Sequence, residues 1–243
     1  MTIGEIRIDY LSHVCFIFTS PSGIRVITDP FFAEGFQWTR GWERCLTPPD
    51  VPVESIRKCD VVFISHIHGD HYDPAAVEAI HRQTGADILA PADVCDDLSA
   101  RGIAASHLKM ASEGAAFNYG DFQLQTHGGY DNSFDGQKRP NKFSLHLATC
   151  ATRLFYSGDC HDPPPSMNGR RVEAVFAWVH PSDAKLAAFL KAIPCARYVL
   201  MHGDRFEPGN FYCNMDMEKE KQRVLRFAPH VEAIIPERVH AIA

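Results

Sequence analysis

The chain has 243 residues, of which 45% are hydrophobic, so it can bury the core of one large domain or two small ones. Its formal net charge of −6 argues against a general nucleic-acid surface, because such a surface needs a basic face. The N-terminus lacks the basic and apolar regions of a signal peptide, and no apolar run approaches the roughly 20 residues that cross a bilayer. We therefore expect a cytoplasmic protein with no integral membrane contact and no bound nucleic acid.

Eight cysteines are scattered along the chain without a Cys-x-x-Cys pair. Most of them lie in apolar runs, as Cys15 does in the run Val14–Phe18. This usage is typical of buried, reduced thiols in a cytosolic protein and not of a disulfide scaffold. Nothing in the sequence around any cysteine indicates a catalytic role.

The first 30 residues predict strands. Residues 5–9 alternate in polarity, residues 13–19 are apolar and β-branched, and residues 24–28 follow a Pro-Ser-Gly turn. Several glycines and prolines in 33–52 predict a loop there, and 60–65 is an apolar strand.

The first helix is expected directly after this strand. Asp73 and Pro74 form an N-cap and first helical residue, and the helix should run to about Thr84, with Gly85 ending it. The segments that follow are predicted as a strand at 88–90, a short helix near 92–101, a strand at 121–126, a polar loop at 128–142, strands at 143–150, 153–157 and 172–179, a helix from Ser182 to before Pro194, and a strand at 197–201. This order predicts an α/β (α+β) protein with sheets packed together and helices outside, in a single domain covering residues 1–243.

The run from Ser65 to His71 holds three histidines and a carboxylate in six consecutive positions, directly after an apolar strand. Neutral imidazole and carboxylate are the usual protein ligands for zinc and similar divalent metals. His66 and His68 are two residues apart, so in an extended segment both point to the same side. Asp70 and His71 follow where the chain should turn, and they can aim at a second point nearby. This spacing predicts a metal site.

Further metal-type residues follow other predicted strands. Asp29, His127, Asp159 and His202 each stand at the end of a different strand. For any one of them alone, a hydrogen-bonded residue at a strand end is the simpler interpretation. Because four strands each deliver such a residue at one end, the joint pattern favours a site built on a rigid scaffold.

In their order along the chain, these residues resemble the metallo-β-lactamase superfamily with its HxHxDH signature. The resemblance covers nearly the whole chain and implies that family's four-layer αββα sandwich. By position it implies one metal held by His66, His68 and His127, a second held by Asp70, His71 and His202, Asp159 bridging both, and Asp29 orienting a ligand histidine. Zinc is the expected ion, and manganese suits the same ligands.

A narrower resemblance lies near the N-terminus. Leu11-Ser12-His13-Val14 with Thr28-Asp29-Pro30 resembles the branch that contains ascorbate-phosphate lactonase and N-acyl-phosphatidylethanolamine phospholipase D. That branch usually has Gly-His where this chain has Ser12-His13. His13 is therefore expected near the metals, in a supporting position behind the ligands, and the alternative is a half-buried strand histidine.

The resemblance implies a hydrolase in which hydroxide bridges two divalent metals and attacks the carbonyl carbon of a small lactone or the phosphorus of a phosphate ester. Such a lactonase or phosphodiesterase needs no serine or cysteine nucleophile, and the chain has no Gly-x-Ser-x-Gly. Asp70 is the candidate for proton handling, because a ligand carboxylate can also hydrogen-bond the bridging water.

Substrate recognition is expected from loops. Segment 31–42 carries five aromatic residues and is a candidate lid over an apolar group, or else a loop that its aromatics pin to the body. Candidate small-molecule contacts are Trp38, Arg40, Arg139, Lys142 and Arg205, and the candidate proton donor is His180. The basic residues of loop 128–142 suit a phosphate or carboxylate, although a solvated charge run is the simpler interpretation.

Other activities of the same fold stay open. An iron-dependent sulfur dioxygenase, or another redox protein, retains much of the motif, although His68 and the short chain argue against flavin-linked di-iron members. A nuclease would usually carry an inserted domain or a basic exosite, and neither is visible. A secreted antibiotic β-lactamase is disfavoured by the missing signal peptide. A homo-oligomer is compatible with the sequence.

Overall fold

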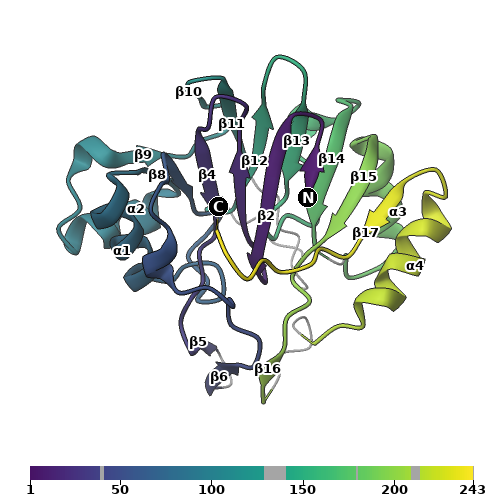
Figure 1. The fold of residues 1–243 in the computed structure, drawn as a ribbon. Helices are drawn as coiled ribbons and strands as arrows, with labels where there is room; N and C mark the ends of the chain where they lie inside the picture. Colours follow the sequence, from purple (N-terminus) through teal and green to yellow (C-terminus); the bar gives the residue numbers. More distant parts are fainter. Residues whose placement is uncertain (39–40, 129–140, 179, 209–213, 243) are drawn as a thin grey trace.

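The computed structural model describes residues 1–242 apart from 39–40, 129–140, 179 and 209–213. The predicted substrate residues Arg40 and Arg139 lie outside the described residues, as does most of the predicted loop 128–142. The described strands form two sheets of seven strands and one of three. The two large sheets stand face to face with helices on the outer flanks (Figure 1).

The first sheet is antiparallel at its N-terminal strands and parallel at the others. Its strands, in spatial order, are β1 (Thr2–Ile3), β2 (Ile6–Ser12), β3 (Cys15–Thr19), β4 (Arg25–Thr28), β7 (Val61–Phe63), β8 (Asp87–Ala90) and β9 (Leu108–Met110). Pairing from β4 to β9 is parallel, so these strands end at the same edge of the sheet.

The second sheet repeats this plan. Its strands, in spatial order, are β10 (Ala116–Tyr119), β11 (Phe122–Gly128), β12 (Phe143–Ala148), β13 (Arg153–Tyr156), β14 (Val172–Ala177), β15 (Cys195–Leu200) and β17 (Glu232–Ile234). The first four are antiparallel, and β13, β14, β15 and β17 are parallel.

Helices cover the outer face of each sheet. They are α1 (Pro74–Thr84), α2 (Ala92–Ala100), α3 (Asp183–Ala192) and α4 (Met217–Phe227), with 3-10 turns η1 (Val53–Ser55), η2 (Ala105–His107) and η3 (Pro165–Met167). The predicted ends of α1 are confirmed: the Asp73 side chain accepts a hydrogen bond from the Ala76 N–H, Pro74 is the first helical residue, and Gly85 adopts a left-handed φ of 71°.

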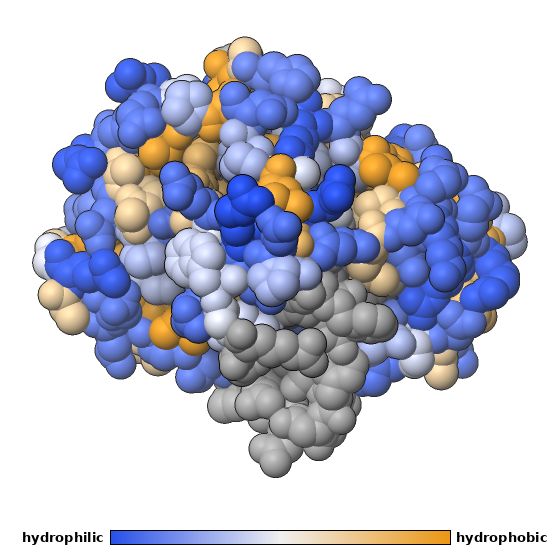
Figure 2. All heavy atoms as spheres, turned by 90° about the horizontal axis from the view of Figure 1, so that it is seen from below, coloured by the Kyte–Doolittle hydropathy of each residue, from blue (hydrophilic) through white to orange (hydrophobic). Residues whose placement is uncertain are grey.

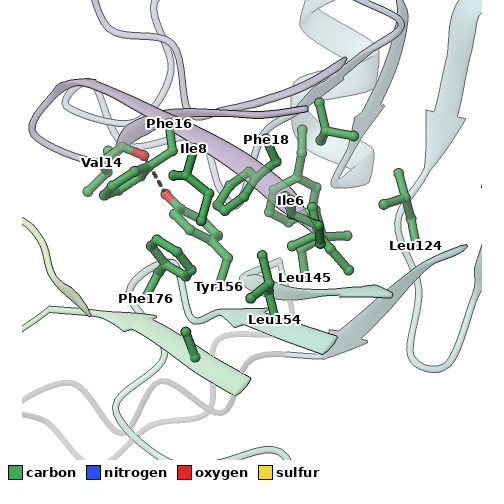
Figure 3. Close-up of a cluster of buried hydrophobic side chains, with 14 of the residues drawn as sticks. Ile6, Ile8, Val14, Phe16, Phe18, Leu124, Leu145, Leu154, Tyr156 and Phe176 are labelled. Atoms are coloured by element: carbon green, nitrogen blue, oxygen red, sulfur yellow. Dashed lines mark hydrogen bonds between the residues drawn. The ribbon is translucent and has the colours of Figure 1, made fainter. Parts of the chain in front are cut away.

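Three buried clusters define four layers. The central cluster lies between the sheets, where Phe176 packs edge-on against Phe16 and Phe18 with ring centroids 5.1 and 5.0 Å apart (Figure 3). A second cluster joins α1 and α2 to the first sheet, and a third joins α3 and α4 to the second sheet. Burial of each such large apolar side chain stabilises the fold by about 1.5–3 kcal/mol. The prediction of packed sheets with helices outside is confirmed.

The predicted loop 33–52 was wrong in part. It contains β5 (Gly35–Trp38) and β6 (Gly41–Cys45), which form an antiparallel hairpin, and β6 also pairs with β16 (Phe206–Glu207). Gly35 starts a strand because the backbones approach closely there, and a Cβ would lie 2.2 Å from the Glu43 carbonyl oxygen. Gly35 therefore permits close packing of two strands, whereas the sequence predicts a turn at this position.

The C-terminal elements α4 and β17 had no sequence prediction. Within the described part of the chain, no helix combines the length and apolar character that a membrane crossing requires. Most of the cysteines among the described residues are buried, as the sequence predicted.

Candidate metal centre

Six of the seven predicted ligands converge at the edge where the parallel strands of both sheets end. His66 follows β7 in the first sheet, while Asp159 follows β13 and His202 follows β15 in the second. Side chains after such strands meet at one edge, which is where α/β sheets bind ligands. In Figure 1 this edge faces downward, because β15 runs down toward β16.

Seen from below, the described surface is mainly hydrophilic, with separate hydrophobic patches (Figure 2).

Two groups of donor atoms lie close enough for each to hold a metal ion. Within each group, all donor atoms lie within 4.8 Å of one another. The larger group consists of His13, Asp70, His71 and His202, and the smaller of His66, His68 and Asp159. Of these residues, only His13 had not been predicted as a ligand. The donor set of imidazole and carboxylate suits zinc or manganese.

The Asp159 carboxylate faces both groups. Its Oδ2 lies 3.3 Å from His66 Nε2 in the smaller group. Its Oδ1 lies 3.0 Å from His71 Nε2 and 3.5 Å from His202 Nε2 in the larger group. One oxygen toward each group is the arrangement that a bridging carboxylate requires.

Carboxylates and imidazoles are neighbours in the centre, and each kind of group shifts the pKa of the other. Burial alone would raise the pKa of Asp70, but the neighbouring His71, together with His13 and His202, holds it well below its usual value. Asp159 behaves likewise, with His71, Lys142 and His66 outweighing its burial. Burial lowers the pKa of His71, yet the two carboxylates raise it to about 9. The neighbouring imidazoles therefore favour the ionised form of both carboxylates, which is the form that could bind a metal.

Asp29 is a buried hydrogen-bond acceptor for residues around the centre. Its Oδ2 accepts hydrogen bonds from His71 Nδ1 at 2.8 Å and from the Tyr156 hydroxyl at 2.6 Å. Both its oxygens also accept from Ser65, through the backbone N–H and the hydroxyl, each at 2.6 Å. The bond to Nδ1 leaves His71 Nε2 facing the Asp159 carboxylate. The role predicted for Asp29, which is to orient a ligand histidine, would use this bond and stays a prediction.

The backbone is strained around the centre. Among the described residues, the non-glycine residues with positive φ are Asn214 and three at this edge, namely His13 at 52°, Asp29 at 37° and His202 at 67°. Such conformations are uncommon for side-chain-bearing residues, and each persists only where surrounding contacts hold it. Three such residues at one edge indicate a site at which tertiary contacts fix the orientation of the side chains.

His127 belongs to neither donor group. It pairs with Ser144 on β12, and its ring neighbours are His146 at 6.3 Å and Phe155 at 6.4 Å between centroids. Its Nδ1 lies 2.8 Å from the Ser166 hydroxyl. Its Nε2 is buried without a hydrogen-bond partner among the described residues. His127 is therefore not among the grouped donor atoms, and its assignment as a ligand stays a prediction.

Aromatic side chains border the centre on the side of the three-stranded sheet. Phe31, Phe36 and Phe206 form a buried cluster beside which Trp38 lies half-buried. The Trp38 ring meets His68 edge-on with centroids 5.2 Å apart. The predicted substrate residue Trp38 therefore stands directly beside the smaller donor group.

Lys142 also reaches the smaller group. It is only 7% exposed, and its Nζ lies 3.4 Å from Asp159 Oδ2. Its charge lowers the pKa of His66 and of His68, after the larger effect of burial in both cases. Among the described residues that were predicted to bind phosphate or carboxylate, Lys142 lies beside Asp159.

Two other predicted residues belong to neither donor group. His180 is buried with its ring 4.5 Å from Phe189 of α3, and burial, with His161 next, lowers its pKa to about 3. Arg205 is exposed, and its backbone N–H donates to the Thr47 hydroxyl. Neither belongs to a donor group, so their roles in catalysis and substrate binding stay predictions.

Sequence reasoning missed four residues that lie around the centre. Tyr156 donates to Asp29 from the core, and Asp204 binds the backbone N–H of His13. The His161 ring packs 4.2 Å from Trp178, whose ring lies 5.1 Å from His202. Only Asp204 had a signal, since it follows His202 closely in the sequence.

Residues 7–181 match a family described as a beta-lactamase superfamily domain. This range contains every residue of the two donor groups except His202. The match covers well over half of the chain, and the chain belongs to this family.

Curated relatives match shorter segments. A UPF0173 metal-dependent hydrolase of Rubrobacter xylanophilus is 32% identical over 101 residues, which is 42% of this chain and 36% of that protein. The cytidine monophosphate-N-acetylneuraminic acid hydroxylase of Mus musculus is 35% identical over 71 residues, 29% of this chain and 12% of that protein. The chain thus spans about a third or less of the length of these relatives.

Solved structures share the fold over nearly the whole chain. An isothiocyanate hydrolase from Delia radicum gut bacteria has a TM-score of 0.70 at 17% identity and covers 95% of this chain and 96% of its own. A metallo hydrolase from Ignicoccus hospitalis has a TM-score of 0.67 at 17% identity, with 96% and 95% coverage. CmlA, a diiron β-hydroxylase from Streptomyces venezuelae, has a TM-score of 0.67 at 14% identity and covers 98% of this chain and 53% of its own. These likenesses confirm the predicted metallo-β-lactamase fold.

Proposed function

We propose that the chain is a metal-dependent hydrolase that uses two divalent metals to cleave a small lactone or a phosphate ester. The observation that carries this proposal is the Asp159 carboxylate, with one oxygen toward each of two donor groups. The hydrolase names among its relatives and the narrower resemblance to a lactonase and phosphodiesterase branch support it.

The residues present suit two divalent ions. His66, His68 and Asp159 would hold one, and Asp70, His71 and His202 the other, with Asp159 shared. Bound divalent metals supply water whose pKa is lowered to about 7, and they polarise the substrate oxygen. Zinc is the expected ion and manganese an alternative, since both accept nitrogen and oxygen ligands.

Asp70 would handle the proton of the attacking water. Its Oδ2 lies 3.5 Å from His13 Nε2 and 3.3 Å from His202 Nε2. Its Oδ1 is buried and has no hydrogen-bond partner among the described residues. Since a buried carboxylate oxygen without a partner is costly, this atom is suited to accept a hydrogen bond from water in the centre.

Two side chains indicate the kind of substrate. The half-buried Trp38 ring offers an apolar surface beside His68, and the Lys142 ammonium offers a positive charge beside Asp159. A ligand with a phosphate or carboxylate next to an apolar group would use both. Replacing Lys142 by methionine keeps an unbranched chain without the charge, and it should raise KM for anionic substrates more than for neutral ones.

The test combines metal analysis with a hydrolysis screen across lactones, phosphodiesters and thioesters. We expect two zinc or manganese ions per chain and metal-dependent turnover of a lactone or a phosphodiester. Asp159→Asn should lower both metal content and turnover. Asp121→Asn is a matched control, because this carboxylate accepts three hydrogen bonds from Ser20 and Ser22. Loss of neither property in Asp159→Asn would overturn the proposal.

An iron-dependent redox reaction is the second candidate. Several relatives are cytidine monophosphate-N-acetylneuraminic acid hydroxylases, and CmlA shares the fold. The same donor groups accept iron, because imidazole and carboxylate also serve that metal. Iron in the purified protein, together with oxygen uptake on a persulfide or another reduced substrate, would favour this candidate over hydrolysis.

A further inference from the structure

His13 occupies the turn between β2 and β3, at the edge where the donor groups lie. Its side chain is 1% exposed, and its backbone has the left-handed φ of 52°. A bulky residue in this region is uncommon outside sites that need it. The position of His13 is therefore imposed by surrounding contacts.

The His13 ring reaches into the larger donor group. Its Nε2 lies 3.5 Å from Asp70 Oδ2, and its ring centroid lies 4.2 Å from that of His202 and 6.0 Å from that of His71.

The buried Asp204 carboxylate binds the backbone of His13. Asp204 accepts hydrogen bonds from the His13 backbone N–H and, at 3.1 Å, from the Tyr10 hydroxyl. Arg238 forms an ion pair with the same carboxylate. On its other side, the His13 carbonyl accepts from the His202 N–H at 3.0 Å. The backbone of His13 is thus bound on both sides, and one of its partners is itself in the donor group.

The segment that carries Arg238 comes from the far end of the chain. It crosses in front of β2 (Figure 1), where Arg238 lies in a parallel bridge with Tyr10 and the Val239 N–H donates to the Tyr10 carbonyl at 2.9 Å. Three chain segments, around residues 10–13, 202–204 and 238, therefore meet at the Asp204 carboxylate.

Aromatic side chains limit the movement of the ring. Phe206 meets it edge-on with centroids 5.2 Å apart, and Phe31 lies at 6.5 Å. A histidine that served only as a hydrogen-bond partner of Asp70 would not need a strained backbone, a buried clamp and an apolar enclosure together. These features preorganise a ligand.

We propose that His13 is a metal ligand, the fourth protein donor of the site formed with Asp70, His71 and His202, and that Asp204 and Arg238 position it. This inference rests on the proposed two-metal function, and it adds a ligand outside the HxHxDH pattern. His13 would complete four protein donors at this site even before the shared Asp159 oxygen is counted.

The test is metal binding by His13→Asn. Asparagine tolerates left-handed φ, so the turn should persist, while the shorter side chain cannot reach the donor group. We expect the affinity of one of the two sites for Zn²⁺ to fall by at least about tenfold, by analogy with the loss of supporting residues at metal sites. In the Co²⁺-substituted protein, the visible absorption bands should change, because they depend on the ligand set.

Three further variants make the result specific. His81→Asn, at a partly buried histidine of α1 that belongs to neither donor group, is the matched control and should bind both metals like the wild type. Arg238→Met should weaken the same site to a smaller extent with the His13 side chain intact. His13→Gln serves if His13→Asn does not fold, as judged by circular dichroism.

Two negative results are distinguishable. If wild-type protein binds no divalent metal, the proposed function fails and this inference with it. If wild-type protein binds two ions and His13→Asn binds two with the same affinity and the same Co²⁺ spectrum, His13 is not a ligand, even if turnover falls.

Discussion

Replacing Asp29 by asparagine should weaken the metal centre without changing any predicted ligand. Asp29 is fully buried and accepts four hydrogen bonds, two from Ser65, one from His71 and one from Tyr156, at 2.6–2.8 Å. Asparagine has the same shape, but only one of its two terminal atoms accepts, and its NH₂ group would face donors that now point at an oxygen.

The magnitude follows from these bonds. A hydrogen bond to a charged group contributes about 1.5–3 kcal/mol, and asparagine retains those made to its remaining oxygen in weaker, neutral form. We therefore expect a loss of about 3 kcal/mol in the free energy of unfolding. Because His71 loses the acceptor that orients its ring, metal affinity should fall about 10–100-fold.

Urea unfolding of the metal-free proteins measures the first effect, and competition with a chromophoric chelator measures the second. Asp121→Asn is the control, since the Asp121 carboxylate also accepts several hydrogen bonds but lies near the surface, away from the metal centre. It should cost less stability and leave metal affinity unchanged. Wild-type metal affinity in folded Asp29→Asn would refute the reasoning.

Other changes have separate expected outcomes. Asp70→Ala should lose nearly all turnover while the protein stays folded, and near-normal turnover of the metal-loaded variant would contradict its proton-handling role. His180 has a pKa of about 3 when folded and about 6.5 when unfolded, so its neutral burial contributes stability that is present above pH 6.5 and is lost as the pH falls toward 3. The stability gap between wild type and His180→Gln in urea should accordingly shrink by about 2–3 kcal/mol between pH 7 and pH 4.5, and an equal gap at both pH values would show that His180 ionises normally. Gly85→Ala should cost about 1 kcal/mol in the same assay because Gly85 has a φ of 71°, and unchanged stability would contradict the left-handed cap.

Features that depend on nearest neighbours in the chain could be predicted from the sequence. The sequence spacing of His66, His68, Asp70 and His71 was enough to predict that they are neighbours. Residues within six positions of one another after a strand cannot lie far apart. The ends of α1 were also readable, since Asp73 and Gly85 act on backbone groups within four residues. Repeated apolar strands and helices likewise predicted packed sheets with helices outside.

Features that depend on pairing distant segments required the tertiary structure. The pairing of β6 with β16 turned a predicted loop into a small sheet, and no local signal records a partner 160 residues away. Strand alternation put His127 on the same face as His146, while long-range contacts of Asp204 brought His13 among the ligand-type residues. The sequence by itself determined the kind of donors and the edge where they gather. Packing decided which of them meet, because ring orientation and backbone strain depend on contacts between remote parts of the chain.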